Sequence, residues 1–134
     1  MPVTAPRPLD LQTQTASAAA LRTFFRITQV WQLNADESAT LLGVPRSTMF
    51  RWKKGEPPAP LPRDTLERLS LIFGIYKALQ VLLPVPERAD AWLRRPNTAP
   101  LFSGSPALAR LLSGMTSDLY VVRTYLDAQR GGWT

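Results

Sequence analysis

Thirteen prolines divide this 134-residue chain into short stretches that each have to fold as a separate element. The prolines cluster at residues 57–62, 84–86 and 96–106. Because proline lacks the backbone N–H and clashes with the preceding turn, a helix cannot continue through such a cluster. Between the clusters, apolar residues recur near a period of 3.6, and no segment alternates as a half-buried strand does. The pattern predicts an all-α fold without internal repeats.

The residue types that are missing exclude several classes of function. The chain has neither Cys nor His, so it lacks a thiolate nucleophile, an imidazole base and a zinc site built from those ligands. Its ten acidic residues are scattered along the sequence. We therefore expect no catalytic residue, no metal and no cofactor. There is no run of 18 apolar residues and no secretory signal, which predicts a cytoplasmic protein without a membrane span.

Composition divides the chain into two lobes between loose ends. Residues 1–15 hold three prolines among small and polar residues, which predicts a flexible arm. Apolar spacing predicts a first helix from residue 17 to about residue 32. A proline-rich connector at residues 56–62 ends the first lobe. The predicted units are an arm at 1–15, an amino-terminal lobe at 16–62, a carboxyl-terminal lobe at 63–129 and a tail at 130–134.

Residues 35–54 have the arrangement of a helix-turn-helix. Asn34 and Glu37 have the spacing of a capping box, and Gly43 can stop the helix that they begin. Pro45 suits the first position of a second short helix. Two short helices that meet at a glycine turn can place the second one in the major groove of DNA.

The second of these helices is basic and carries no acid. Met49 and Trp52 supply its apolar contacts, so its other face is free either for solvent or for DNA. The net charge of +6 favours an anionic partner. Pro45 and Phe50 stand where such helices often carry polar side chains, which leaves few groups for reading bases. The predicted DNA-binding residues are Arg46, Ser47, Thr48, Arg51, Lys53 and Lys54.

A long helix begins at Asp64, and its apolar residues cover more than one face. The main stripe runs from Leu66 to Leu83, and Ile75 adds apolar surface beside it. This surplus predicts either a second lobe or a homodimer, and operator recognition by two-fold symmetric proteins also favours a homodimer. The remaining predicted helices lie at residues 87–94 and 106–113, with a last helix capped by Thr116 or Ser117.

A rarer motif follows the long helix. The pattern W-L-x-x-P-N-x-x-x-x-x-x-G-x-P is made by Trp92, Leu93, Pro96, Asn97, Gly104 and Pro106. Taken alone, the first two residues predict core packing, and Asn97 and Gly104 predict a shaped loop. With the helix-turn-helix, the motif resembles the Xre/MbcA/ParS antitoxins, which are partners of RES-domain toxins. The resemblance extends over about residues 21–133.

The resemblance implies an antitoxin that neutralises an NAD-consuming RES-domain toxin by occluding its active site and that represses its own operon. It also implies that the end of the chain reaches the toxin's cleft, through Arg130, Gly131, Gly132 and Trp133. We expect the antitoxin to be a homodimer within a hetero-oligomeric complex. Two alternatives remain: a helix-turn-helix repressor with a small-molecule effector and no toxin, and a small enzyme, which the missing Cys and His disfavour.

Overall fold

The computed structural model describes residues 8–130, with side chains from residue 14 onward. Within these residues the chain forms seven helices, and the only β-type pairing is an isolated bridge between Pro96 and Pro106. The prediction of an all-α fold is therefore confirmed. None of the described helices is long and apolar enough to cross a bilayer. The helices are α1 (Pro8–Val30), α2 (Ala35–Leu42), α3 (Arg46–Lys53), α4 (Arg63–Leu82), α5 (Pro86–Trp92), α6 (Ala107–Leu111) and α7 (Thr116–Gln129).

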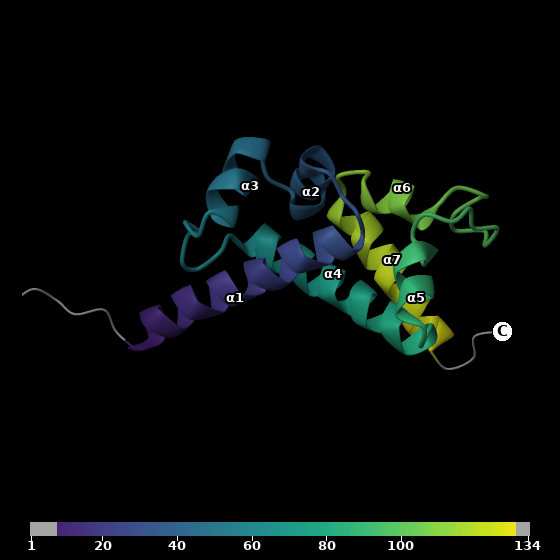
Figure 1. The fold of residues 1–134 in the computed structure, drawn as a ribbon, viewed down its shortest axis with the longest axis horizontal. Helices are drawn as coiled ribbons and strands as arrows, with labels where there is room; N and C mark the ends of the chain where they lie inside the picture. Colours follow the sequence, from purple (N-terminus) through teal and green to yellow (C-terminus); the bar gives the residue numbers. More distant parts are fainter. Residues whose placement is uncertain (1–7, 131–134) are drawn as a thin grey trace, which may run out of the picture.

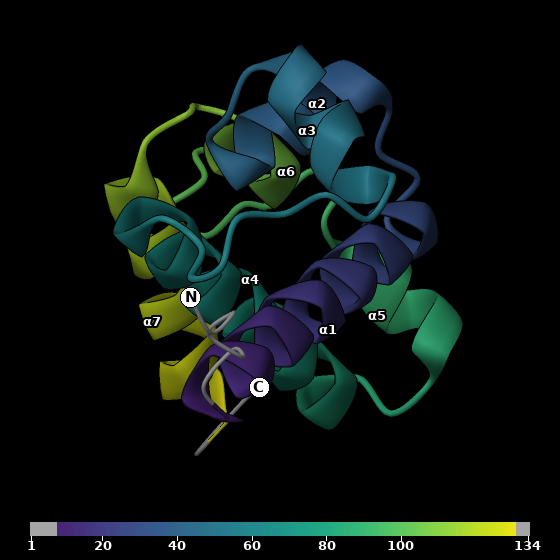
Figure 2. The same cartoon turned by 90° about the vertical axis from the view of Figure 1, so that its left-hand side faces the viewer.

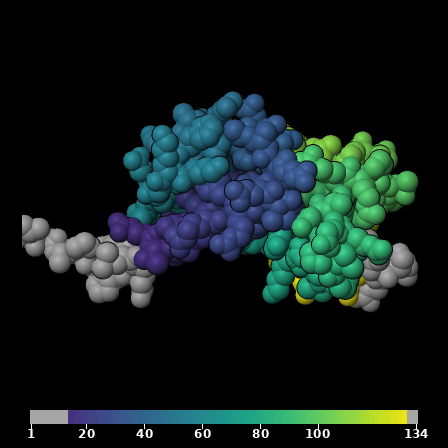
Figure 3. Space-filling model, viewed as in Figure 1, coloured from purple at the N-terminus to yellow at the C-terminus, as the bar shows by residue number. Residues whose placement is uncertain are grey.

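Helix α4 joins the two ends of the molecule. Figure 1 shows α2 and α3 above α1 and α4 at one end, with α5, α6 and α7 gathered at the other. The view at right angles shows α1 crossing α4 (Figure 2). Helix α4 contacts α1, α2, α5 and α7, and its contact with α7 is the most extensive between any two helices described. On the surface, the amino-terminal and carboxyl-terminal elements form two neighbouring masses (Figure 3).

The buried apolar side chains form one cluster to which every described helix contributes. The surplus apolar surface predicted for α4 is real, because Leu69, Ile72 and Ile75 are all nearly inaccessible to solvent. Leu66 departs from the predicted stripe and is 47% exposed. Helices of the same chain cover the other faces of α4, so this surface is explained by the second lobe. It no longer argues for a homodimer.

The first helix begins earlier than the sequence indicates. Residues 8–15 belong to α1, so the prediction of a flexible arm is wrong for them, while residues 1–7 lie outside the described part. Pro8 is the first residue of α1. Proline is well suited to that position, because its fixed φ matches a helix and the first turn needs no N–H donor. Pro8 therefore begins a helix within the segment that the prolines predict to be an arm.

The local signals around α2 are confirmed. The Glu37 N–H donates to the Asn34 side chain at 2.8 Å, and the Asn34 N–H donates to Glu37 Oε1 at 2.9 Å. These are the two reciprocal bonds of a capping box. Gly43 ends α2 with a φ of +77°, a left-handed conformation that costs glycine no Cβ clash.

The starts of α3 to α7 each differ from the predicted position by one or two residues. Pro45 precedes α3 instead of beginning it, because its ψ of 152° is extended. The predicted cap of α7 at Thr116 or Ser117 is wrong, since Met115 is the residue before the helix. No side chain among the described residues caps α7, and the Ser113 hydroxyl accepts the Met115 N–H at 3.1 Å just before the helix.

The turn at Gly43 packs directly against a buried arginine of α4. The side chain of Arg68 donates to Asp64 Oδ2 at 3.0 Å and to the Gly114 carbonyl at 2.8 Å. A Cβ at residue 43 would overlap the Arg68 guanidinium, whereas a Cβ at Gly55 would meet nothing within 4 Å. Arg68 thereby connects the helix-turn-helix to the loop between α6 and α7.

We expect Gly43→Ala to lower the free energy of unfolding by about 2–4 kcal/mol, measured by thermal or urea denaturation. The left-handed backbone costs an alanine about 1 kcal/mol, and displacing Arg68 adds the loss of charge-assisted hydrogen bonds. Gly55→Ala is the matched control, because its φ of +98° carries the backbone cost alone. Equal losses in the two variants would show that Arg68 does not constrain the turn.

Candidate functional site

Helix α3 is held by two buried side chains and turns the opposite side to solvent. Met49 is 2% exposed and Trp52 6%, and both belong to the core cluster. At about 100° of rotation per residue, the side away from them is the outer face of α3. The outer face consists of Ser47, Phe50, Arg51 and Lys54, with Arg46 at its edge, and all five are exposed.

The structure brings most of the predicted DNA-binding residues to solvent. Arg46, Ser47, Arg51, Lys53 and Lys54 are exposed, and Thr48 is half-buried. Lys53 lies apart from the outer face, since its ammonium is 5.6 Å from the centroid of the Phe25 ring on α1. Thr48 lies at the other edge of the helix, nearer the buried side. The two therefore flank the outer face, which suits contacts to a DNA backbone better than contacts to bases.

Arg46 already has two partners within the chain. Its Nη1 donates to Asp36 Oδ1 on α2 at 3.2 Å, and its guanidinium carbon lies 5.4 Å from the centroid of the Phe50 ring. Both members of the ion pair are exposed, so the pair contributes little to stability. A DNA phosphate or base could replace Asp36 as the partner of Arg46 at little cost.

Basic residues of α1 extend this surface, although they are not among the predicted DNA-binding residues. Arg22 lines a hollow of about 230 Å³ together with Lys53, Lys54 and Gly55. Arg26 lies one turn further along the same side of α1. Their spacing of four residues predicts that the two arginines share one side of a helix. Only the packing of α1 against α3 brings that side of α1 to the helix-turn-helix. No ion pair among the described side chains involves Arg22, Arg26, Arg51, Lys53 or Lys54.

The motif residues of the second half shape a loop around an aromatic cluster. Trp92 and Leu93 are buried, as predicted, and Phe102 packs edge-on against Trp92 with ring centroids 5.8 Å apart. Asn97 Oδ1 accepts the Ala99 N–H at 3.0 Å, which confirms the expected bond to local backbone. Gly104 has the expected positive φ, +87°. These motif residues therefore stabilise the second half, and a partner that binds its surface would contact other side chains.

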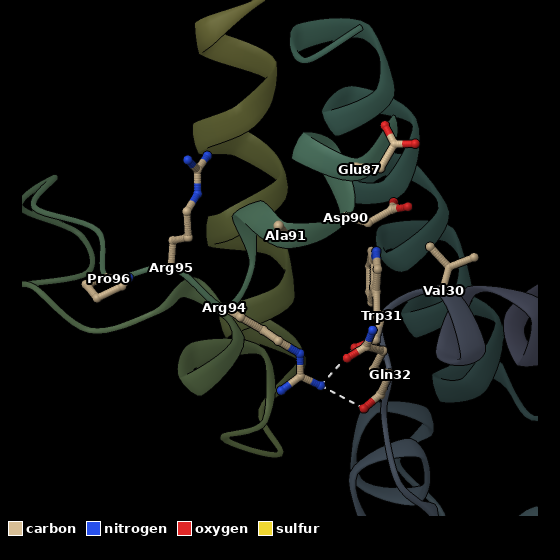
Figure 4. A pocket seen from close by; sticks show the side chains of 9 residues that line it. All are labelled: Val30, Trp31, Gln32, Glu87, Asp90, Ala91, Arg94, Arg95 and Pro96. Atoms are coloured by element: carbon tan, nitrogen blue, oxygen red, sulfur yellow. Dashed lines mark hydrogen bonds between the residues drawn. The ribbon is translucent and has the colours of Figure 1, made fainter. Parts of the chain in front are cut away.

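Arg94 joins the two halves of the molecule. Its Nη2 donates to the Trp31 carbonyl at 2.8 Å and to the Gln32 carbonyl at 2.7 Å, at the end of α1 (Figure 4). Beside it lies a hollow of about 500 Å³ between α1 and α5, which Glu87 and Asp90 also line. Val30, Trp31 and Ala91 line the same hollow, so it offers apolar surface as well as charged groups.

We expect Arg94→Ala to lower the free energy of unfolding by about 1–2 kcal/mol, because two carbonyls at the end of α1 lose a charged donor. Arg95→Ala is the control, since the Arg95 side chain is exposed and forms no hydrogen bond or ion pair with the described residues. That change should stay within about 0.5 kcal/mol. Thermal denaturation of both variants distinguishes the loss of the Arg94 hydrogen bonds from the general effect of removing a positive charge.

Most of the predicted toxin-binding tail lies outside the described residues. Arg130 is exposed at the end of α7, with its Nη1 3.9 Å from Asp127 Oδ1. Gly131, Gly132 and Trp133 are beyond the described part of the chain. Their contact with a toxin remains a prediction.

Comparison with known proteins accounts for both halves. The model of the antitoxin Xre-like helix-turn-helix domain matches residues 10–74, and that of the antitoxin Xre/MbcA/ParS C-terminal toxin-binding domain matches residues 78–132. The chain belongs to the Xre/MbcA/ParS antitoxins. It is 54% identical over 115 residues to uncharacterized protein y4oB of Sinorhizobium fredii (strain NBRC 101917 / NGR234). The aligned residues make up 85% of this chain and 86% of that relative.

Family membership settles three predictions. The antitoxin has a helix-turn-helix domain and a toxin-binding domain, and its partner is a cognate toxin. It is not an enzyme, because this family of antitoxins is a non-enzymatic class. The two matched segments meet between residues 74 and 78, which lie inside α4.

Proposed function

We propose that this antitoxin neutralises a RES-domain toxin that consumes NAD, and that it represses its own operon from the outer face of α3. The toxin class is supported by the motif from Trp92 to Pro106, which resembles that of antitoxins paired with RES-domain toxins. Both activities would take place in the cytoplasm, where operator DNA and NAD are present together.

The neutralising step that we propose is occlusion of the toxin's active site by the end of the chain. Arg130 is exposed where α7 ends, so the residues after it start from the surface. Gly131 and Gly132 have no Cβ to obstruct entry into a narrow cleft. Trp133 is of the residue type that most often anchors an interface. The helices of the second half would provide the remaining contacts with the toxin.

The observation that carries the repressor role is the unpaired positive charge on and beside α3. Arg51, Lys53 and Lys54 have no acidic partner among the described residues, and Arg22 adds a fourth cation from α1. Neutralising phosphates with such groups releases condensed counterions, which supplies most of the affinity for DNA. The amino end of α3 would then read base edges from the major groove.

We also propose that the antitoxin acts as a homodimer within the toxin complex. The support is the two-fold symmetry of the operators that helix-turn-helix proteins recognise, with half-sites about one helical turn apart. Light scattering on the purified antitoxin at micromolar concentration tests this proposal. A monomer under those conditions, with and without operator DNA, would contradict it.

Co-expression with the adjacent open reading frame tests the proposed function as a whole. We expect the neighbouring gene product to stop growth and lower cellular NAD when expressed alone, and the antitoxin to restore both and co-purify with it. A toxin that arrests growth without lowering NAD would contradict the RES assignment. If no complex forms and a small molecule alone releases DNA, the repressor alternative is the right one.

A further inference from the structure

An aromatic ring occupies the middle of the basic outer face of α3. Phe50 is 38% exposed, although it lies on the same helix as the buried Met49 and Trp52. It is not among the partly buried apolar side chains that pack against the core. The exposed part of the ring adds nothing to folding, since the hydrophobic contribution scales with the apolar area removed from water. Among the exposed large apolar side chains of the described residues, Phe50 is the one that lies on the outer face of α3.

The charges around Phe50 indicate what kind of partner fits this face. Arg46 and Lys54 are its neighbours one turn before and one turn after on the helix, and Arg51 adjoins it. Helix α3 carries no acidic residue. A ring enclosed by exposed cations fits a polyanion with an apolar group near its charges, and duplex DNA is such a ligand.

One apolar group is available to a side chain in the major groove. Thymine presents its C5-methyl group there, beside the acceptors and donors of the base edges, and a phenyl ring can contact it. We propose that Phe50 contacts a thymine methyl group and makes the antitoxin prefer thymine at that position of its operator. This inference rests on the proposed DNA binding and adds a residue that determines sequence preference.

Arg46 holds the ring in place for such a contact. Its guanidinium carbon lies 5.4 Å from the ring centroid, and its Nη1 donates to Asp36 Oδ1 at 3.2 Å. The contact between the cation and the ring favours this placement of Phe50 before DNA arrives. Phe50 supplies readout without a hydrogen bond, at a position where such helices often carry a polar side chain.

Replacement of thymine by deoxyuridine tests the proposal with the unaltered protein, because uracil pairs with adenine in the same way and lacks only the methyl group. The probe is a duplex that the antitoxin selects from a random-sequence library. Each thymine is replaced in turn, and affinity is measured by fluorescence anisotropy. We expect one position in each half-site at which the loss is about fourfold per methyl group, and near-unity ratios elsewhere.

Two variants assign the effect to Phe50. Phe50→Ala should bind the thymine and deoxyuridine duplexes with equal affinity. Lys54→Ala should weaken binding to both and keep the fourfold ratio, because it removes a phosphate contact. Equal affinity of the unaltered protein for every substituted duplex would overturn the proposal, as would a ratio that survives in Phe50→Ala. If the library yields no bound duplex at all, the repressor role fails as well.

Discussion

Replacing Arg51 and Lys54 by alanine will weaken operator binding about a hundredfold or more and leave toxin neutralisation unchanged. Both side chains are exposed on the outer face of α3 and have no ion-pair partner among the described residues. Loss of a base contact costs about 1–3 kcal/mol, and each lost phosphate contact lowers the slope of log affinity against log salt by about 0.9. In a dimer each loss occurs twice.

The measurement is a titration of a duplex from upstream of the antitoxin gene at several salt concentrations, together with growth rescue in cells that express the toxin. Arg88→Ala combined with Arg95→Ala is the control, because it removes the same charge from α5 and the loop after it. That control should bind DNA within about twofold of the unaltered protein. A similar loss in both double variants would mean that net charge, and not the outer face of α3, determines DNA affinity.

Deleting residues 130–134 will abolish growth rescue and leave DNA affinity and thermal stability unchanged. A buried tryptophan anchor accounts for about 2 kcal/mol or more of binding, so affinity for the toxin should fall at least about thirtyfold. Loss of occlusion should also leave the toxin active in any complex that still forms. The measurement is NAD consumption by the toxin at increasing antitoxin concentration, beside operator binding by the same preparation.

Trp133→Ala separates the anchor from the length of the tail. We expect it to weaken neutralisation nearly as much as the deletion does, since the tryptophan is the proposed anchor. Full neutralisation by the shortened chain would show that the helices of the second half inhibit the toxin without the tail. Loss of DNA binding in the same variant would indicate a folding defect, which thermal denaturation would reveal.

Features set by neighbouring residues could be predicted from the sequence. The capping box of Asn34 and Glu37, the turn at Gly43 and the burial of Trp92 each depend on side chains a few positions apart or on one large apolar group. The outer face of α3 was predictable for the same reason, because helical spacing alone separates Arg51 from the core side.

Features set by packing could not be predicted in this way. Arg22 becomes part of the basic surface only when α1 lies against α3, far along the chain. The surplus apolar surface of α4 fitted a homodimer and a second lobe equally well until the helices that cover it were placed. Arg68 looks like a surface arginine in the sequence, yet its buried guanidinium fits beneath Gly43 because that residue has no side chain.

The continuity of α4 has a consequence for how the two activities combine. The segments matched by the two family models meet inside this helix, and its buried side chains belong to the same core cluster as those of both halves. A fragment cut at that junction would expose the inner sides of Ile72 and Ile75 and lose its fold. A recombination event between relatives at this point would have to preserve the packing contacts of α4 with both halves. A toxin bound to the second half would therefore be held in one orientation relative to the outer face of α3.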